Sequence, residues 1–197
     1  MINRVQYSPS FQKKLVAKVD LPSQSGKEHC SIYELDEGKK DAKRLKKQIK
    51  KQNWDYSDQF IGHLKDTNNP EAKSLGVKVF SIEDEKKECL GLLRSFNFGW
   101  MKNIDYIEVN PKYQSSKKDA KVKNIGSALI TYLIKSNKDS DFVVLHPDKK
   151  AYGFYDKMGF EFIKSYDGIK FELNADKVPE TIKNAEEKFV SNIEILG

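Results

Sequence analysis

One strand–helix–strand segment constrains the fold of this 197-residue chain more than any other feature. Apolar residues between Ile125 and Leu133 follow the i, i+3, i+4, i+7, i+8 spacing of one helix face, which predicts a strong amphipathic helix. An alternating strand at residues 104–109 precedes this helix, and residues 142–145 form a continuous apolar run typical of a central, covered strand. This arrangement predicts a right-handed parallel crossover and therefore an α/β sheet.

The rest of the pattern adds strands and helices around this unit. Further strands are predicted at residues 30–35, 77–82, 89–98, 160–165 and 169–173. Further helices are predicted at residues 38–52, 57–65, 148–158 and 176–191. We therefore expect one α/β domain with a mixed central sheet and helices on both faces. Its predicted limits are residues 29–173, between an N-terminal extension (1–28) of unassigned structure and a C-terminal helical extension (174–197).

Composition excludes some classes of protein and leaves others open. The formal net charge of +6 fits an anionic ligand, but it also fits ordinary solubility. The two cysteines, Cys30 and Cys89, have no metal-ligand spacing and lie in predicted strands, so we expect free thiols and no metal site. No stretch reads as a signal peptide or approaches the roughly 18 apolar residues of a membrane span. We expect a cytoplasmic protein.

A glycine in the first turn of the strong helix marks a candidate anion site. Gly126 lies in the stretch Lys123-Asn124-Ile125-Gly126-Ser127-Ala128, and its missing Cβ would let a ligand approach the backbone. The unpaired N–H groups and the dipole of a first helical turn favour an anion such as a phosphate. Tight packing of the helix on a strand would explain the same residues, and the hexapeptide alone does not separate the two interpretations.

A second informative segment is the helix at residues 148–158, which Gly159 terminates. The pattern predicts that Phe154 and Met158 are core residues. Tyr155 differs from them, because a phenol combines an apolar body with a proton that it can donate.

Together these segments resemble the central motifs of the GNAT acetyltransferases. The family pattern Q/R-x-x-G-x-G/A is matched by Lys123, Gly126 and Ala128, with lysine in the first position. The late pattern N-x-x-A-x-x-F-Y-x-x-x-G-F is matched by Asp148, Ala151, Phe154, Tyr155, Gly159 and Phe160, with aspartate in place of asparagine. The resemblance covers residues 29–173 and implies a GNAT-like domain in which two splayed strands, 104–109 and 142–145, bind acetyl-coenzyme A.

The resemblance also implies roles for single residues. Backbone N–H groups of residues 125–128 would hold the pyrophosphate of coenzyme A, and the strand end at Val109 would bind its pantetheine arm. Tyr155 matches the tyrosine that protonates the leaving thiolate in many family members. The full implied cofactor-binding set is Val109, Lys123, Asn124, Ile125, Gly126, Ser127, Ala128, Asp148 and Ala151.

The identity of the general base is left open. It could be either of two carboxylates, or the enzyme could use no side-chain base. Some family members place a carboxylate four residues before the strand-end valine, and here that residue is Asp105. Glu108 is the alternative, although strict alternation puts it on the opposite face from Asp105 and Val109. Either could be a solvated strand residue, and some family members use water chains. We place Tyr155 first among the catalytic candidates, then Asp105, then Glu108.

Two lysine-rich segments stand outside the motifs. Residues 114–122 form an insertion relative to the family pattern, and its lysines could reach the phosphates of coenzyme A; a mobile, solvated loop is the favoured interpretation. Residues 39–51 contain eight basic residues, a density that nucleic-acid binding needs. Their apolar stripe and the lack of interleaved aromatic residues favour a solvated helix face instead.

The sequence therefore predicts an acetyl-coenzyme A-dependent N-acetyltransferase that moves an acetyl group directly to a primary amine of a small molecule or a protein. The resemblance implies that the region before the second predicted strand shapes the acceptor site, which makes Trp54, Tyr56 and Phe60 candidate wall residues. One alternative is a non-catalytic acyl-coenzyme A-binding module. Another is an RNA-directed enzyme that acts on an aminoacyl-tRNA, as toxin members of the family do. The acceptor is not specified, and a homodimer is left open.

Overall fold

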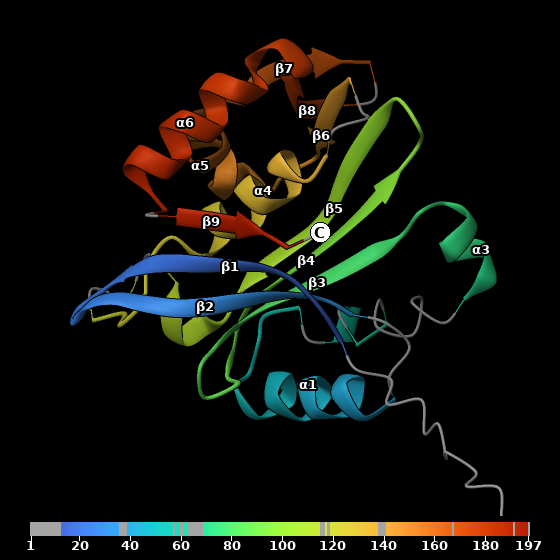
Figure 1. The fold of residues 1–197 in the computed structure, drawn as a ribbon. Helices are drawn as coiled ribbons and strands as arrows, with labels where there is room; N and C mark the ends of the chain where they lie inside the picture. Colours follow the sequence, from blue (N-terminus) through green and yellow to red (C-terminus); the bar gives the residue numbers. More distant parts are fainter. Residues whose placement is uncertain are drawn as a thin grey trace, which may run out of the picture.

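In the computed structural model the chain forms one nine-stranded mixed sheet, with strands in the order β7-β8-β6-β5-β4-β3-β2-β1-β9 (Figure 1). The structure describes residues 13–35, 39–56, 58–59, 61–62, 69–114, 117, 119–137, 141–166, 168–190 and 192–196. The strands are β1 (Lys14–Ser23), β2 (Gly26–Glu34), β3 (Lys78–Asp84), β4 (Cys89–Asn97), β5 (Met101–Val109), β6 (Phe142–Leu145), β7 (Glu161–Ser165), β8 (Gly168–Asn174) and β9 (Asn192–Ile195). The α-helices are α1 (Lys39–Lys51), α3 (Pro70–Ser74), α4 (Ile125–Lys135), α5 (Tyr152–Lys157) and α6 (Val178–Lys188).

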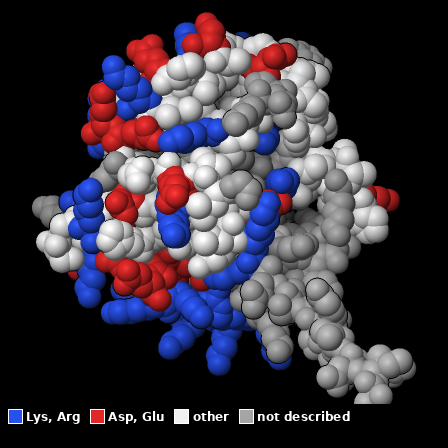
Figure 2. Space-filling model, viewed as in Figure 1, with Lys and Arg blue, Asp and Glu red and all other residues white. Residues whose placement is uncertain are grey.

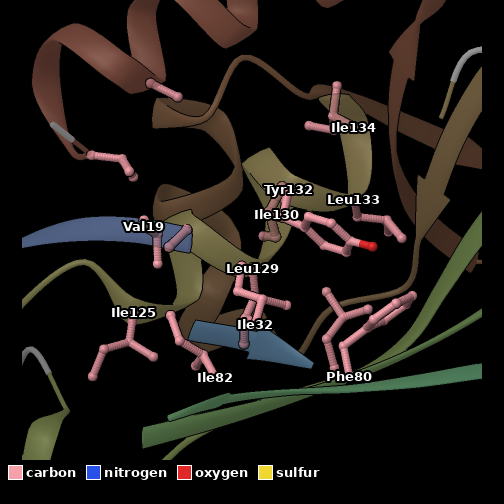
Figure 3. Packing of buried hydrophobic residues seen from close by; sticks show 14 of the residues in the cluster. Val19, Ile32, Phe80, Ile82, Ile125, Leu129, Ile130, Tyr132, Leu133 and Ile134 are labelled. Carbon is pink, nitrogen blue, oxygen red and sulfur yellow. The ribbon is translucent and has the colours of Figure 1, made fainter. Parts of the chain in front are cut away.

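Helices cover both faces of the sheet, as the sequence predicts. On one face α4 forms the centre of the main core, and α6 contacts its other side, so that nine of the 11 residues of α4 are buried. Figure 3 shows the labelled side chains of α4 packed together with those of β1, β2 and β3. Tyr132 of α4 meets Phe80 of β3 edge to face, with ring centroids 5.2 Å apart. The mixed α/β architecture is thereby confirmed.

The opposite face carries a second, smaller core under α1. Leu45 and Ile49 of α1 are completely buried against Trp54, Val79 and other apolar residues of β3 and β4. The burial of Leu45 and Ile49 confirms the predicted apolar stripe of the helix at these two positions. The predicted helix at residues 57–65 lies largely outside the described residues. Within that range, the structure describes residues 58, 59, 61 and 62, and these four are helical.

Both ends of the chain contribute strands to the same sheet. β1 pairs antiparallel with β2 on one side and with β9 on the other. The sheet thus crosses the limits that the sequence suggests at residues 28 and 173, because β2 spans the first and β8 the second. Helix α6 corresponds to the predicted final helix. The pattern does not predict β9, because a four-residue alternation is too short to stand out beside a polar helix.

A close approach of α4 to the sheet depends on Gly91 in β4. A Cβ at this position would lie 2.7 Å from Cγ2 of Ile125 and 3.3 Å from the carbonyl oxygen of Glu108. Gly91 pairs with Val109, the last residue of β5. The missing side chain therefore sets how closely the first turn of α4 lies to the end of β5.

We expect Gly91→Ala to lower the free energy of unfolding by about 1–3 kcal/mol, because the added methyl group overpacks a rigid contact with a β-branched side chain. Urea denaturation followed by circular dichroism measures this loss. Gly153→Ala is the matched control, since a Cβ there meets nothing within 4 Å. An unchanged midpoint for Gly91→Ala would show that α4 can move away from β4 without cost.

Candidate active site

Among the described strands, β5 and β6 form the only parallel pair, and they separate after four residues. Pairing runs from Met101–Phe142 to Ile104–Leu145, and residues 105–109 of β5 extend past it, where no described strand pairs with them on that side. His146 and Pro147 follow β6, and a proline cannot donate a ladder hydrogen bond. A cavity of about 440 Å³ opens where the two strands part. The splayed strands predicted from the sequence are confirmed.

Six of the predicted catalytic and cofactor-binding residues line this cavity. All three catalytic candidates are among them, although they come from β5 and α5 on opposite sides of the gap. The six are Asp105, Glu108, Val109, Asp148, Ala151 and Tyr155.

Tyr155 enters the cavity from α5. Its ring packs against Phe154, Phe160 and Phe171, with centroids 5.0, 5.9 and 6.0 Å away, and the residue is only 4% exposed. Burial, together with the negative charge of Asp148, raises the pKa of the phenol above its ordinary value. Tyr155 therefore keeps its proton at neutral pH and can act as a donor, while the aromatic packing fixes its direction.

Glu108 lies on the other side of the cavity and is also buried. It accepts hydrogen bonds from the hydroxyl of Tyr106 and from the backbone N–H of Tyr56, the latter at 3.4 Å. Burial raises the pKa of Glu108, and the hydrogen bond from Tyr106 opposes this shift. A carboxylate with a raised proton affinity, held by two donors, is suited to accept a proton.

Asp105 does not lie on the sheet face that strict alternation along the strand predicts. The pairing of β5 with β4 shifts between Tyr106–Arg94 and Ile104–Ser95, so Asp105 is an extra residue in a β-bulge. Its carboxylate forms an ion pair with Arg94, which lies opposite Tyr106. The prediction that Asp105 shares the face of Val109 is wrong, because the bulge turns it toward the side of Tyr106 and Glu108. An exposed, ion-paired carboxylate is less suited to be a base than Glu108.

A contact between distant segments spans the cavity. The hydroxyl of Tyr56, in the segment after α1, donates to Asp148, in the segment after β6, at 3.1 Å. Lys150 lies 5.8 Å from the centre of the Tyr56 ring and 3.9 Å from Asp148. Tyr56 thus forms a wall of the cavity, and Asp148 is committed to a protein partner. Trp54 is buried in the core under α1 and does not line the cavity, and Phe60 lies outside the described residues.

The first turn of α4 lies next to the cavity but does not line it. A Cβ on Gly126 would sit 3.6 Å from Val109, which does line it, and 3.5 Å from Phe154. The first intrahelical bond runs from the N–H of Ala128 to the carbonyl of Asn124, so the N–H groups of residues 125–127 have no acceptor within the helix. These donors are available to an anion at the mouth of the splay.

The other predicted phosphate-site residues have structural partners. Asn124 adopts a left-handed conformation (φ 61°), and its side-chain amide donates to the carbonyl of Phe189 at 2.8 Å rather than capping α4. Ile125, Ser127 and Ala128 are buried, so that only their backbone could meet a ligand. Lys123 is exposed at this end of the helix.

The insertion at residues 114–122 docks onto the turn between β1 and β2. The N–H of Gln24 donates to the carbonyl of Lys121, and the N–H of Lys123 donates to that of Pro22, both at 3.0 Å. Val122 is buried, 4% exposed. The predicted solvated loop is therefore wrong for residues 120–122, because their partner lies a hundred residues away in the sequence. Residues 115, 116 and 118 lie outside the described part.

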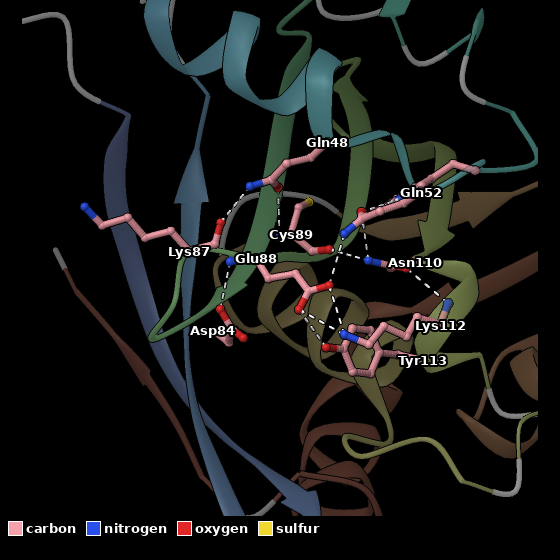
Figure 4. A network of polar contacts seen from close by, with 10 residues as sticks. Gln48, Gln52, Asp84, Lys87, Glu88, Cys89, Asn110, Lys112 and Tyr113 are labelled. Atoms are coloured by element: carbon pink, nitrogen blue, oxygen red, sulfur yellow. Dashed lines mark hydrogen bonds and ion pairs between the residues drawn. The ribbon is translucent and has the colours of Figure 1, made fainter. Parts of the chain in front are cut away.

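A polar network fixes the end of β5 (Figure 4). The side-chain amide of Asn110, which is fully buried, donates to Gln52 at 3.0 Å and to the carbonyl of Cys89 at 2.9 Å. Glu88 accepts from Gln52 at 3.0 Å and from the hydroxyl of Tyr113 at 2.9 Å. The network joins the end of α1 to the strand end that borders the cavity. In the sequence Asn110 is only a turn residue before a proline, which gives no signal of this role.

Comparison with solved structures shows which fold this is. An inferred acetyltransferase from Exiguobacterium sp. 255-15 aligns with 77% of this chain and 97% of its own, at 18% identity and a TM-score of 0.54. A GNAT-family protein from Desulfovibrio desulfuricans, inferred to be an acetyltransferase, aligns over 74% and 98% at 13% identity and a TM-score of 0.55. The spermidine/spermine N-acetyltransferase of Vibrio cholerae, in two mutant forms, aligns over 77% and 96% at 15% identity and 0.52.

At these identities the likeness establishes the fold, and this chain has the fold of the GNAT acetyltransferases. The resemblance drawn from the motifs is confirmed at that level. No protein-family model and no curated protein matches the sequence. Among the described residues, no helix is long and apolar enough to cross a membrane. Nor does the described part of the chain bring three or more His, Cys, Asp or Glu side chains together in a way that could hold a metal ion.

Proposed function

We propose that this protein transfers an acetyl group from acetyl-coenzyme A directly to a primary amine. The observation that carries the proposal is the cavity between β5 and β6, which Glu108 and Tyr155 reach from opposite sides. One of these groups has a raised affinity for a proton and the other retains a proton that it can give. The GNAT fold adds support, although a fold alone does not determine a reaction.

The residues around the splay fit acetyl-coenzyme A. No described strand pairs with the end of β5 on the cavity side, so its backbone near Val109 can bind an extended amide-bearing arm. The unbonded N–H groups at the start of α4, with Gly126 leaving space beside Val109, would hold phosphate groups. When bound, the cofactor supplies an activated acetyl thioester with a thiolate leaving group. Ala151 and Asp148 would border it on the side of β6.

The acceptor half of the cavity is acidic. Asp55, Asp105 and Glu108 line it together with the rings of Tyr56 and Tyr106, and the ion pair with Arg94 offsets the charge of Asp105. Carboxylates and aromatic rings both attract a cation, so this half favours an amine that arrives as an ammonium ion. A small-molecule amine or a protein amine fits this chemistry.

The two ionisable groups divide the proton transfers. Glu108 accepts the proton that the amine must lose, and Tyr106 and Tyr56 hold its carboxylate toward the cavity. Tyr155 donates its phenolic proton to the departing thiolate. The cavity walls orient the two reactants, which removes most of the entropic cost of bringing them together. A cytoplasmic location accords with this proposal and stays a prediction.

The cofactor site is tested by calorimetric titration with acetyl-coenzyme A. Gly126→Asp should weaken binding about 10-fold or more, because like charges some 4 Å apart repel by roughly 1–4 kcal/mol near a protein surface. The aspartate would not harm folding, since a carboxylate in a first helical turn is favourable. Gly126→Ala is the control, because its Cβ makes only ordinary contacts at 3.5 and 3.6 Å. Equal affinity in the wild type and Gly126→Asp would exclude this phosphate site.

Tyr155→Phe should leave acetyl-coenzyme A binding unchanged and lower kcat by about 10²–10⁴-fold, the usual contribution of a positioned acid. Its packing with Phe154 and Phe160 does not involve the hydroxyl, so the variant should fold normally. Release of free coenzyme A with a panel of small amines and amine-bearing peptides measures turnover. A variant with wild-type kcat would remove Tyr155 from the reaction, and wild-type binding without turnover on any amine would favour a non-catalytic module.

The base is identified by the pH dependence of kcat. Because the pKa of Glu108 is raised above its ordinary value of 4.5, kcat should fall as the pH drops through that raised value. Glu108→Gln should lose most of the activity together with this acidic limb. Asp105→Asn removes the other carboxylate candidate of the same strand and should keep the limb. If Asp105→Asn loses the acidic limb of the pH profile and Glu108→Gln keeps it, the base is Asp105. If both variants keep the acidic limb, the proton leaves through a water chain.

A further inference from the structure

We propose that the outward face of α1 is a docking surface for nucleic acid, bound through its phosphate backbone. Eight basic residues and one acidic residue give this 13-residue helix a formal charge of +7. The whole chain has a formal charge of +6, so the other 184 residues together carry a charge of −1. The excess positive charge of the protein is therefore concentrated on one helix. Figure 2 shows Lys and Arg side chains gathered over α1 at the lower edge of the molecule.

The packing of α1 turns these charges outward. Leu45 and Ile49 are fully buried against the sheet and hold the helix in one orientation. Arg44 on the flank of the helix is used internally, in an ion pair with Glu83 at 2.8 Å. The lysine face, as we call it, is formed by Lys43, Lys46, Lys47, Lys50 and Lys51.

The lysine face has no protein partner within the part of the chain that the structure describes. None of its five members forms an ion pair with a described carboxylate, whereas Lys78, Lys112 and Lys135 elsewhere each form one. Lys43 and Lys50 lie about 10 Å apart along the helix axis, at roughly 1.5 Å per residue. One strand of a duplex offers a phosphate about every 3.4 Å along its axis, so several phosphates can meet this face at once.

The composition of the lysine face favours nucleic acid over the other polyanions. A membrane-surface helix inserts an apolar face among the lipids, but Leu45 and Ile49, the apolar residues of α1 whose side chains the structure describes, are already buried in the protein. The cores of protein–protein interfaces are depleted in lysine and enriched in aromatic residues. Interfaces with nucleic acid are instead strongly positive and polar. With no aromatic side chain on α1, binding should not depend on base sequence.

The test is fluorescence anisotropy with a labelled 20-nucleotide RNA of mixed sequence and the DNA of the same sequence, at several salt concentrations. We expect both to bind. Five single-strand phosphate contacts give a slope of log K against log salt of about −3.5, hence a loss of roughly 100-fold between 50 and 200 mM salt. Replacing all five lysines of the face by Gln should abolish most of this binding. Gln preserves helix propensity, and the buried stripe stays intact.

A second variant separates the lysine face from bulk charge. Lys27, Lys157, Lys164, Lys183 and Lys188 are exposed lysines on other elements, and their replacement by Gln changes the net charge by the same amount. It should bind RNA like the wild type. Acetyl-coenzyme A titration should be equal in all three proteins, so this proposal and the acetyl-transfer proposal can fail separately. Equal loss in both lysine variants, no salt-dependent binding by the wild type, or tighter binding to vesicles of anionic phospholipid than to RNA would each overturn it.

Discussion

The early separation of β5 from β6 is the constraint on which the rest of this site depends. A sheet normally continues pairing as far as its shorter strand allows, and β6 is only four residues long and followed closely by Pro147. Among the described strands, only β4 therefore pairs with the last five residues of β5. Side chains of both sheet faces border the gap on the other side. No single helix or loop could bring Glu108 and Tyr155 to one cavity in this way.

The free end of β5 needs other support, and the structure supplies it from both faces of the sheet. On one face the first turn of α4 lies against Gly91, which admits it because there is no side chain in the way. On the other face Gln52, at the end of α1, receives the buried amide of Asn110. Gly91, Gln52 and Asn110 thus support the strand end, although none of them lines the cavity.

The sequence predicts the parts of this arrangement that are written in local patterns. The periodicity of α4, the apolar run of β6 and the position of Tyr155 after Ala151 depend on neighbours within a few residues, so the fold class and half of the cavity could be predicted. The bulge at Asp105 could not, because it arises from the register with β4. The docking of Val122 on the β1–β2 turn is equally non-local. Alternation fails where a partner strand, rather than the strand itself, decides which way a side chain points.

Comparison of Asp105 with Glu108 shows what this non-local information changes. A motif-based argument prefers Asp105 because it lies four residues before Val109 in the sequence. In the structure, however, the carboxylate of Asp105 is exposed and neutralised by Arg94. Glu108 is buried, and its two donors, Tyr106 and Tyr56, come from its own strand and from the segment after α1. The segment after α1 is held in position because Leu45, Ile49 and Trp54 pack α1 onto the sheet. The packing that turns the lysines of α1 outward thus also positions Glu108, so one small core orients both the carboxylate of the cavity and the basic surface.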